Sequence, residues 1–260
     1  MTAGPDTSRS FAIGGDMDVN RIGYGAMRLT GQPGNFGPYP DWEDGVALLR
    51  RAYALGVRFF DSAYAYGPGW ADRILGEALG DSDAVIATKG GVDKPVPGQI
   101  TVDGSPEALR RQVEAALENL RRDRIDLFQL HRVDPQTPIE TSVAALADMQ
   151  SEGLIRHIGL SNVDQTQLER AMSAAPIASV QNRFNAAERG AEAMVEFTAA
   201  RGIAFIPYGP LGAHPMEAGA KLNPQVALAW LLRRAPNIVA IPGTTDIAHL
   251  EANVGVWSEV

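Results

Sequence analysis

The sequence predicts an α/β protein with a single domain, a closed (β/α)8 barrel of parallel strands surrounded by helices. Three observations lead to this fold class. Eight short apolar runs occur within the 260 residues, and most are followed by a segment whose apolar residues have helical spacing. Strict alternation of strands and helices favours parallel strands joined by right-handed crossovers. Eight such units in about 250 residues match the size of a closed barrel.

An open, doubly wound sheet is the alternative architecture, but its nucleotide-binding fingerprint is missing. In a GxGxxG pattern beginning at Gly23, Arg28 stands where the third glycine is required, and Asp72 stands there in the stretch beginning at Gly67. No GxxxxGK segment occurs either. The closed barrel is therefore the preferred architecture.

The N-terminal residues are expected to lie outside the barrel strands. Residues 1–10 are polar and predict a flexible tail, and residues 11–19 predict a small hairpin around a glycine-rich turn. The strand-like runs are residues 22–25, 57–60, 84–88, 125–130, 155–160, 178–180, 203–206 and 238–241.

Helices are expected between these runs. Asp41 is a candidate cap for the first helix, and residues 137–140 (Thr-Pro-Ile-Glu) have the pattern of a capping box with proline at the first helical position. The expected helices cover residues 41–56, 70–79, 105–120, 137–153, 164–174, 191–200, 225–234 and 247–253.

Composition argues against several classes of protein. With 31 acidic and 23 basic residues the formal charge is −8, which argues against a nucleic-acid partner. The absence of cysteine excludes disulfides and thiolate metal sites, and the four histidines lack paired-ligand spacing, so no metal is expected. The polar N-terminus and the lack of a run of about 18 apolar residues predict no signal peptide and no membrane span. A cytoplasmic location is expected.

Four groups able to hold or move a proton fall at the ends of three successive predicted strands. Asp61 ends one strand and Tyr66 lies in the loop beyond it, while Lys89 and His131 end the next two. Each alone also fits a structural role: a loop cap for Asp61, a rim residue for Tyr66, a surface cation for Lys89 and a core histidine for His131. Because catalytic groups of barrels lie at the carboxyl ends of strands, the four placements together favour one shared pocket.

The chemistry of this set suits the reduction of a carbonyl group. Tyrosine has a reference pKa of about 10, and a nearby ammonium is expected to lower it. A carboxylate beside Lys89 would keep the lysine charged and fixed. His131 could donate to a substrate carbonyl or relay a proton to Tyr66. A tyrosine acid of this kind would protonate an oxygen that becomes an alkoxide after hydride transfer.

Several blocks resemble, in order, the signature segments of aldo-keto reductases, over about residues 11 to 254. They are residues 60–67 (FDSAYAYG), 88–89 (TK), 130–131 (LH), 158–162 (IGLSN), 181–182 (QN), 207–211 (PYGPL) and 241–243 (IPG). The resemblance implies a (β/α)8 barrel that reduces aldehydes or ketones with NADPH, with NADH as the alternative. It implies Tyr66 as the acid, Asp61, Lys89 and His131 as the rest of a tetrad, and the hairpin as a plug at the bottom of the barrel. The segment from Tyr24 to Gly31 is most similar to the branch that includes pyridoxal reductases.

The same resemblance implies a set of cofactor-binding residues. Ser161, Asn162 and Gln181 would bind the nicotinamide carboxamide, and Tyr208 would stack on its ring. Gln181 as a turn residue and Thr244-Thr245 as a helix cap remain structural alternatives. The full implied set is Ala26, Met27, Asp61, Ser161, Asn162, Gln181, Tyr208, Gly209, Pro210, Leu211, Gly212, Gly243, Thr244, Thr245, His249 and Asn253.

The sequence also departs from the family pattern. Where many members place a lysine and an arginine on the 2′-phosphate of the cofactor, the matching positions are Gly243 and His249. The connection between Gly212 and Asn223 is short for the family, and the chain ends at Val260 soon after the last expected helix. The barrel is therefore expected to be shortened in its last βα unit and at its C-terminus, with a less covered pocket.

The substrate and the partners are less well defined by the sequence. Phe36, Tyr39, Tyr64 and Trp70 are candidates for the substrate wall, together with Trp42, although the two tryptophans could equally pack between helices. A small-molecule carbonyl substrate and a monomer are expected. A cofactor-binding regulatory or partner subunit on the same scaffold, like the β subunits of potassium channels, is the alternative function. A non-redox barrel such as an isomerase is a third.

Overall fold

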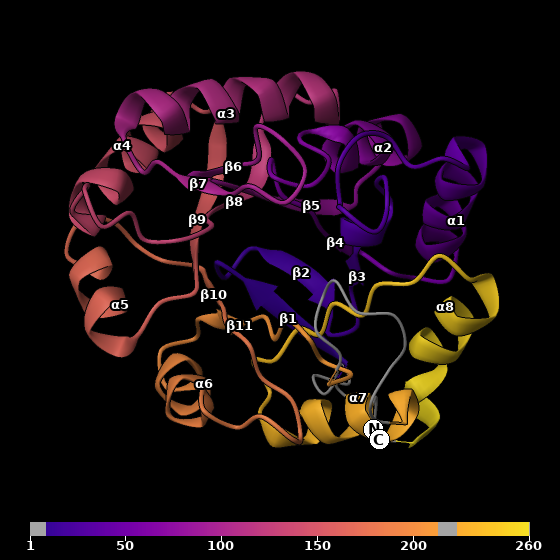
Figure 1. The fold of residues 1–260 in the computed structure, drawn as a ribbon. Coiled ribbons are helices and arrows are strands. Elements are labelled where there is room, and N and C mark those ends of the chain that lie inside the picture. The colour runs from indigo at the N-terminus through magenta and orange to yellow at the C-terminus, as the bar shows by residue number, and fades with distance from the viewer. Residues whose placement is uncertain (1–8, 213–222, 260) are drawn as a thin grey trace.

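A computed structural model describes residues 9–212 and 223–259. Its centre is a curled sheet of seven strands, and all neighbouring strands run parallel (Figure 1). In spatial order the strands are β3 (Tyr24–Gly25), β4 (Phe59–Asp61), β5 (Val85–Gly90), β8 (Ile125–Leu130), β9 (Ile155–Ser161), β10 (Ser179–Gln181) and β11 (Ala204–Phe205).

The eighth predicted strand closes the sheet through a few hydrogen bonds and is not a regular strand. On one side, the N–H of Val239 donates to the carbonyl of Phe205 at 2.9 Å. On the other, the N–H of Gly23 donates to Ala240 at 2.8 Å, and that of Ala240 donates to Arg21 at 2.9 Å. The segment therefore joins β11 to β3, which confirms the predicted barrel.

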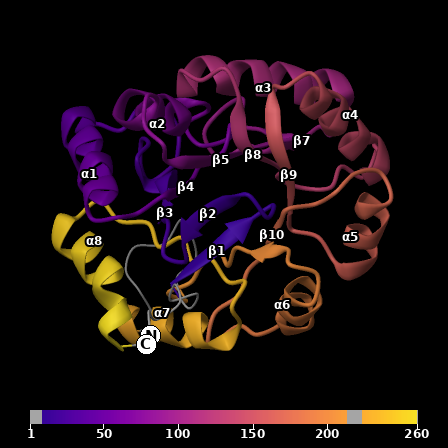
Figure 2. The ribbon, with the colours of Figure 1, turned by 180° about the vertical axis from the view of Figure 1, so that it is seen from behind.

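Helices surround the sheet on its outer face (Figures 1 and 2). None of those within residues 9–212 and 223–259 is both long and apolar enough to cross a membrane. In this described part of the chain the α-helices are α1 (Trp42–Ala54), α2 (Trp70–Leu79), α3 (Pro106–Leu120), α4 (Ile139–Ser151), α5 (Gln165–Met172), α6 (Glu192–Ala199), α7 (Pro224–Arg234) and α8 (Ile247–Val254).

Two helix starts differ in detail from the prediction. Asp41 occupies the N-cap position of α1, but its side chain makes no capping hydrogen bond. The predicted capping box at the start of α4 is wrong, because Pro138 is the N-cap residue. The hydroxyl of Thr137 donates instead to Oδ2 of Asp134 at 2.8 Å. A nearby carboxylate is a strong acceptor for a hydroxyl, so it competes with the helix end.

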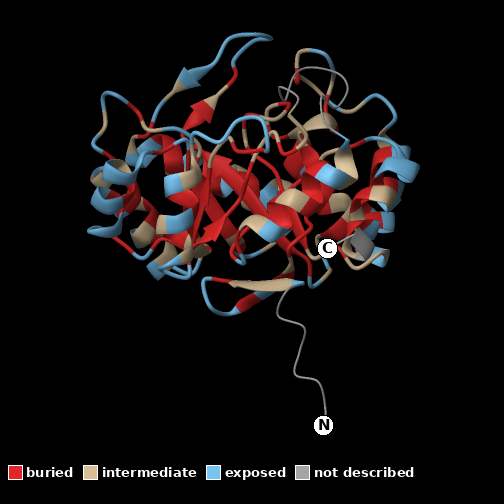
Figure 3. Cartoon of the chain, turned by 90° about the horizontal axis from the view of Figure 1, so that it is seen from below, coloured by how far each residue is buried: buried red, intermediate tan, exposed pale blue. Residues whose placement is uncertain are grey.

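The antiparallel hairpin of β1 (Ser10–Ile13) and β2 (Met17–Asn20) closes one end of the barrel, as predicted (Figure 3). Its buried face is apolar and includes Ile13 and Met17, which belong to the same core cluster as Phe59 and Leu127. Residues 1–8, which are most of the expected tail, and residues 213–222, which form the short connection, lie outside the described residues.

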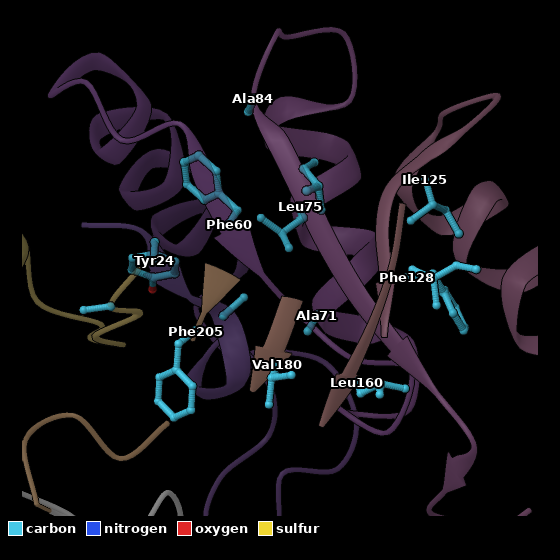
Figure 4. Packing of buried hydrophobic residues seen from close by; sticks show 14 of the residues in the cluster. Tyr24, Phe60, Ala71, Leu75, Ala84, Ile125, Phe128, Leu160, Val180 and Phe205 are labelled. Atoms are coloured by element: carbon cyan, nitrogen blue, oxygen red, sulfur yellow. The ribbon is translucent and has the colours of Figure 1, made fainter. Parts of the chain in front are cut away.

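Alternating side chains along the strands build two cores, one inside the barrel and one between sheet and helices. Phe59 faces the inner cluster, whereas the next residue, Phe60, belongs to the outer cluster together with Phe128 and Phe205 (Figure 4). This is the period of two expected of a strand. Burying each such ring is worth about 1.5–3 kcal/mol, so the cores hold the strand ends in fixed positions.

Four short elements were not predicted. The antiparallel pair β6 (Val92–Asp93) and β7 (Thr101–Val102) follows β5 and stands at the carboxyl-end side of the sheet. Two 3-10 helices, η1 (Ala26–Arg28) and η2 (Gly255–Glu259), follow β3 and α8. Two of them bear on the site, because Val92 of β6 and both Met27 and Arg28 of η1 line the cavity at the carboxyl ends of the strands.

Candidate active site

A cavity of about 1020 Å³ opens at the carboxyl ends of the strands, where barrels hold their reactive groups. Asp61 is the last residue of β4 and His131 follows β8, and both line this cavity. Tyr66 lines it from the loop after β4. Lys89, near the end of β5, lies completely buried against Asp61. The parallel order β4-β5-β8 therefore brings together the four side chains expected to share a pocket.

The ion pair of Lys89 and Asp61 is buried on both sides. Nζ of Lys89 lies 2.7 Å from Oδ2 of Asp61 and also donates to the carbonyl oxygen of Ser62 at 2.7 Å. Burial disfavours the ammonium form, but the carboxylate of Asp61 and the hydroxyl of Tyr66 outweigh it and raise the pKa of Lys89. The lysine is therefore charged at neutral pH.

The phenol of Tyr66 lies beside this ammonium. Nζ of Lys89 is 5.1 Å from the centre of the Tyr66 ring, so its charge acts on the phenol. Burial nevertheless raises the pKa of Tyr66, and Lys89 offsets this only in part. The expected lowering of this pKa is therefore wrong, because desolvation of a phenolate outweighs one ammonium that is already paired. The hydroxyl is held in its proton-donating form.

His131 completes the group as a neutral imidazole. Its ring centre lies 6.0 Å from that of Tyr66, with the two planes at 85°. Burial, together with the positive charges of Lys89, Arg132 and Lys94, lowers the pKa of His131 well below its usual range. Among the described residues, its buried Nδ1 has no hydrogen-bond partner. An orphaned polar atom beside a cavity is a group that a ligand can satisfy.

Two glutamines hold the other oxygen of Asp61. Nε2 of Gln181 donates to Oδ1 at 2.8 Å, and Nε2 of Gln129 donates to the same atom at 3.3 Å. Gln181 was expected to bind a carboxamide, but this N–H is already used within the protein. Gln129 was missed, and its only sequence signal is a polar residue within the apolar run of β8.

A second hydrogen-bonded group flanks His131. Nδ2 of Asn162 donates to the carbonyl of His131 at 3.1 Å and to Oγ of Ser161 at 3.0 Å, and its Oδ1 accepts from the hydroxyl of Tyr208 at 2.9 Å. Asn162 has a φ of +58°, a left-handed conformation uncommon for non-glycine residues. Backbone strain of this kind concentrates at functional sites. All three side chains line the cavity.

The cavity continues toward the start of α8. Asp246 is the N-cap of that helix and accepts from the N–H of His249 at 2.8 Å, which excludes Thr244-Thr245 as the cap. Of the other residues expected at the cofactor, Ala26 and Gly212 do not line the cavity. Those that do are Met27, Gly209, Pro210, Leu211, Gly243, Thr244, Thr245, His249 and Asn253.

The aromatic residues expected at the substrate wall, Phe36, Tyr39, Tyr64 and Trp70, are not among those that line the cavity. Trp70 packs edge-on against Trp42, with ring centres 5.8 Å apart, so the alternative of helix packing holds for both tryptophans. The corresponding wall comes from segments that follow the barrel strands and that were not singled out from the sequence. Its residues are Arg28, Asn35, Val92, Lys94, Ile100 and Arg132.

A second buried carboxylate, Asp72 of α2, lies behind the site. It accepts from the hydroxyl of Thr88 at 2.9 and 3.1 Å and is completely buried. Burial raises the pKa of Asp72 to about 6, although the charge of Lys89 acts in the opposite direction. Among the described residues, no group of three or more histidine or carboxylate side chains is placed to hold a metal ion.

Comparison with known proteins gives a consistent result. The sequence model of the aldo/keto reductase family matches residues 21–224. The chain is 42% identical to pyridoxine 4-dehydrogenase of Escherichia coli, over 95% of this chain and 92% of that protein. It is 40% identical to an uncharacterized oxidoreductase of Schizosaccharomyces pombe, over 92% and 82% of the two chains.

Solved structures have the same fold. The glycerol dehydrogenase of Gluconobacter oxydans superposes with a TM-score of 0.85 at 25% identity, over 96% of this chain and 90% of that one. An aldo/keto reductase from Klebsiella pneumoniae in complex with NADP and acetate gives a TM-score of 0.75 at 25% identity, over 95% and 89%.

Proposed function

Because the chain belongs to the aldo/keto reductase family, we propose that it reduces an aldehyde or ketone to an alcohol with Tyr66 as the proton donor. The observation that carries the proposal is the buried Lys89–Asp61 pair placed against the Tyr66 phenol. A bound nicotinamide cofactor would supply the hydride. The protein would supply the proton, the orientation of the carbonyl and the exclusion of water.

Each side chain has a role that follows from its surroundings. Tyr66 would donate its hydroxyl proton to the carbonyl oxygen as negative charge develops there. Lys89 would stabilise the resulting phenolate, and Asp61 would hold the ammonium in place. His131, neutral and with an unsatisfied Nδ1, would orient the substrate by hydrogen bonding without adding charge.

NADPH is the proposed cofactor, because the cavity is lined by polar side chains and loop segments that could bind its parts. The polar group of Ser161, Asn162 and Tyr208 would hold the nicotinamide, and residues 209–211 and 243–245 would hold the phosphates and the adenosine. The structure of the Klebsiella pneumoniae reductase with NADP supports this choice. The lack of a cationic side chain at Gly243 makes NADH the alternative to test.

Substitution of Tyr66 by phenylalanine tests the proposal most directly. Tyr66→Phe removes only the hydroxyl, so we expect turnover of an aldehyde to fall about 10²- to 10⁴-fold. The affinity for NADPH, measured by fluorescence titration, should stay close to that of the wild type. Tyr64→Phe, two residues away and outside the cavity lining, is the matched control.

Substantial residual reduction by Tyr66→Phe would contradict the role of the phenol. A wild type that binds NADPH but oxidises it with no aldehyde in a panel including pyridoxal would indicate the partner subunit instead. The four assembled side chains favour the enzyme. Separate titrations of NADPH and NADH decide the cofactor preference.

A further inference from the structure

The part of the cavity next to His131 carries positive charge, although the whole chain has a formal charge of −8. Lys94 and Arg132 line the cavity there, and both are close enough to His131 to act on its charge state. With Lys89, they are the charged groups that lower the pKa of this imidazole. This local excess is the opposite of the charge of the protein as a whole.

Lys94 is buried without a carboxylate. Its residue is 6% exposed, and Nζ donates to the backbone carbonyls of Asn35 at 2.9 Å and Gly34 at 3.4 Å. The neighbouring carboxylate of Asp93 accepts from the backbone N–H of Lys94 at 2.7 Å. Within the described residues, no acidic side chain forms an ion pair with this ammonium. A buried cation that lacks a counter-charge is costly, so a ligand anion would stabilise it.

Arg132 supplies a second cation from the carboxyl end of β8. It is exposed and lines the cavity, and its charge favours a lower pKa of both His131 and Tyr208. No ion pair of Arg132 is formed with the residues the structure describes. Of the carboxylates in the described ranges, the two that line the cavity have other partners: Asp61 pairs with Lys89, and Glu188 pairs with Arg183 at 2.5 Å.

We propose that Lys94 and Arg132 form an anion subsite that holds a carboxylate or phosphate group of the carbonyl substrate. The inference rests on the proposed function and narrows its substrate class to aldehydes or ketones that carry a second, negatively charged group. A guanidinium fork matches two oxygens of such a group, and an ammonium adds a point charge. Val92 and Ile100, which line the same wall, would contact the apolar body between the anion and the carbonyl.

Matched pairs of substrates test this subsite. The probes are the three isomers of carboxybenzaldehyde and the corresponding carbamoylbenzaldehydes, which differ by one charge at almost constant shape. We expect the wild type to favour at least one carboxylate over its amide by about tenfold or more in kcat/KM, as a charge-assisted hydrogen bond would give. This ratio should fall toward one in Arg132→Gln and decrease as salt is added.

Arg124→Gln is the matched control, because Arg124 is also exposed but precedes β8, at the opposite end of the strand. Its carboxylate-to-amide ratio should equal that of the wild type. Lys94→Met provides a second variant, with a thermal melt to detect any loss of the contacts to Asn35 and Gly34. A wild-type ratio near one for all three isomers, or a ratio unchanged in both variants, overturns the subsite.

Calorimetric binding of the hydroxymethylbenzoates and hydroxymethylbenzamides in the presence of NADP separates this inference from the proposed reaction. Binding of a benzoate that is lost in Arg132→Gln supports the subsite even without turnover, in which case only the reductase proposal fails. Turnover that depends on Tyr66 but ignores the anion leaves the reductase and removes the subsite. A loss of NADP affinity in Arg132→Gln would assign this arginine to the nucleotide and overturn the inference.

Discussion

Nε2 of Gln181 donates to Oδ1 of Asp61 at 2.8 Å, linking residues that are 120 positions apart in the sequence. The other oxygen of the carboxylate accepts from Lys89, so the acid is held from both sides. Asp61 is thereby fixed between β5 and β10, and the ammonium beside Tyr66 has one defined position. The proposed proton donor depends on this arrangement.

The two glutamines on Asp61 should differ in their functional effect. Gln181→Met and Gln129→Met each remove one hydrogen bond to the carboxylate, and hydrogen bonds to charged groups are worth about 1.5–3 kcal/mol. We expect the free energy of unfolding, measured by chemical denaturation, to fall by about 2 kcal/mol in Gln181→Met. In Gln129→Met it should fall by about 1 kcal/mol, because the hydrogen bond of Gln129 is longer. Of these two glutamines, Gln181 lines the cavity and Gln129 does not, so Gln181→Met alone should weaken nucleotide binding. Equal effects of both substitutions on nucleotide affinity would contradict this distinction.

The kcat/KM of carbonyl reduction should not change with pH near neutrality. Tyr66 must be protonated to donate, and burial raises its pKa above the ordinary value of about 10. The pKa of His131 is well below its ordinary value of about 6.5, so the imidazole stays neutral. We therefore expect that neither group changes kcat/KM for reduction by titrating between about pH 6.5 and about pH 10. A limb near pH 6.5 that disappears in His131→Gln would show that the imidazole titrates there.

Much of the placement of the four groups could be predicted, because local sequence marks strand ends clearly. Apolar runs end at Asp61, Lys89 and His131, and the structure places each of them within one residue of the end of a strand. The hairpin and the closed barrel were predicted for the same reason. Each of these features depends on residues that are close in sequence or on the regular alternation of elements.

The remaining features depend on contacts that a linear pattern does not contain. The partner of Gln129 follows from the alignment of neighbouring strands. The direction of the Tyr66 pKa follows from burial, which is a property of the assembled loops. The wall beside Lys94 is built by β6 and the connection from β6 to β7, and strands of two residues leave too short a pattern to detect. The expected aromatic wall rested on aromatic residues in and next to the loops, whose directions a sequence does not give, and Trp70 packs on Trp42 instead.

Asp72 should make stability depend on pH with an unusual sign. Its pKa is raised from 3.8 to about 6 in the folded protein, so the folded state keeps this proton after the unfolded state has lost it. The associated stability is present below pH 3.8 and is lost as the pH rises to about 6. The change is about 3 kcal/mol at most. Asp72→Asn cannot ionise, so its stability relative to the wild type should rise between these pH values in denaturation measured at each pH. A difference that stays constant would show that Asp72 does not titrate in this range.

The hairpin that closes the barrel offers a test that is independent of catalysis. Gly14 and Gly15 both have left-handed backbones, with φ of +66° and +85°. A Cβ at Gly14 would lie 2.4 Å from Cε1 of His157, whereas a Cβ at Gly15 would meet nothing within 4 Å. We expect Gly15→Ala to cost about 1–2 kcal/mol from backbone strain alone, and Gly14→Ala to cost about 1–3 kcal/mol more from overpacking. Urea denaturation measures both losses.

The extra cost of Gly14→Ala should shrink when His157 is also replaced by alanine, because the contact is then removed. His157 also pairs with Asp16, at 2.5 Å between Nε2 and Oδ1, so His157→Ala alone supplies the baseline for a double-mutant cycle. Equal costs for Gly14→Ala and Gly15→Ala would mean that the hairpin turn moves freely away from β9. In that case the hairpin would not be fixed against the strands whose opposite ends carry Asp61 and Lys89. The cycle therefore tests how firmly the lower end of the barrel supports the site.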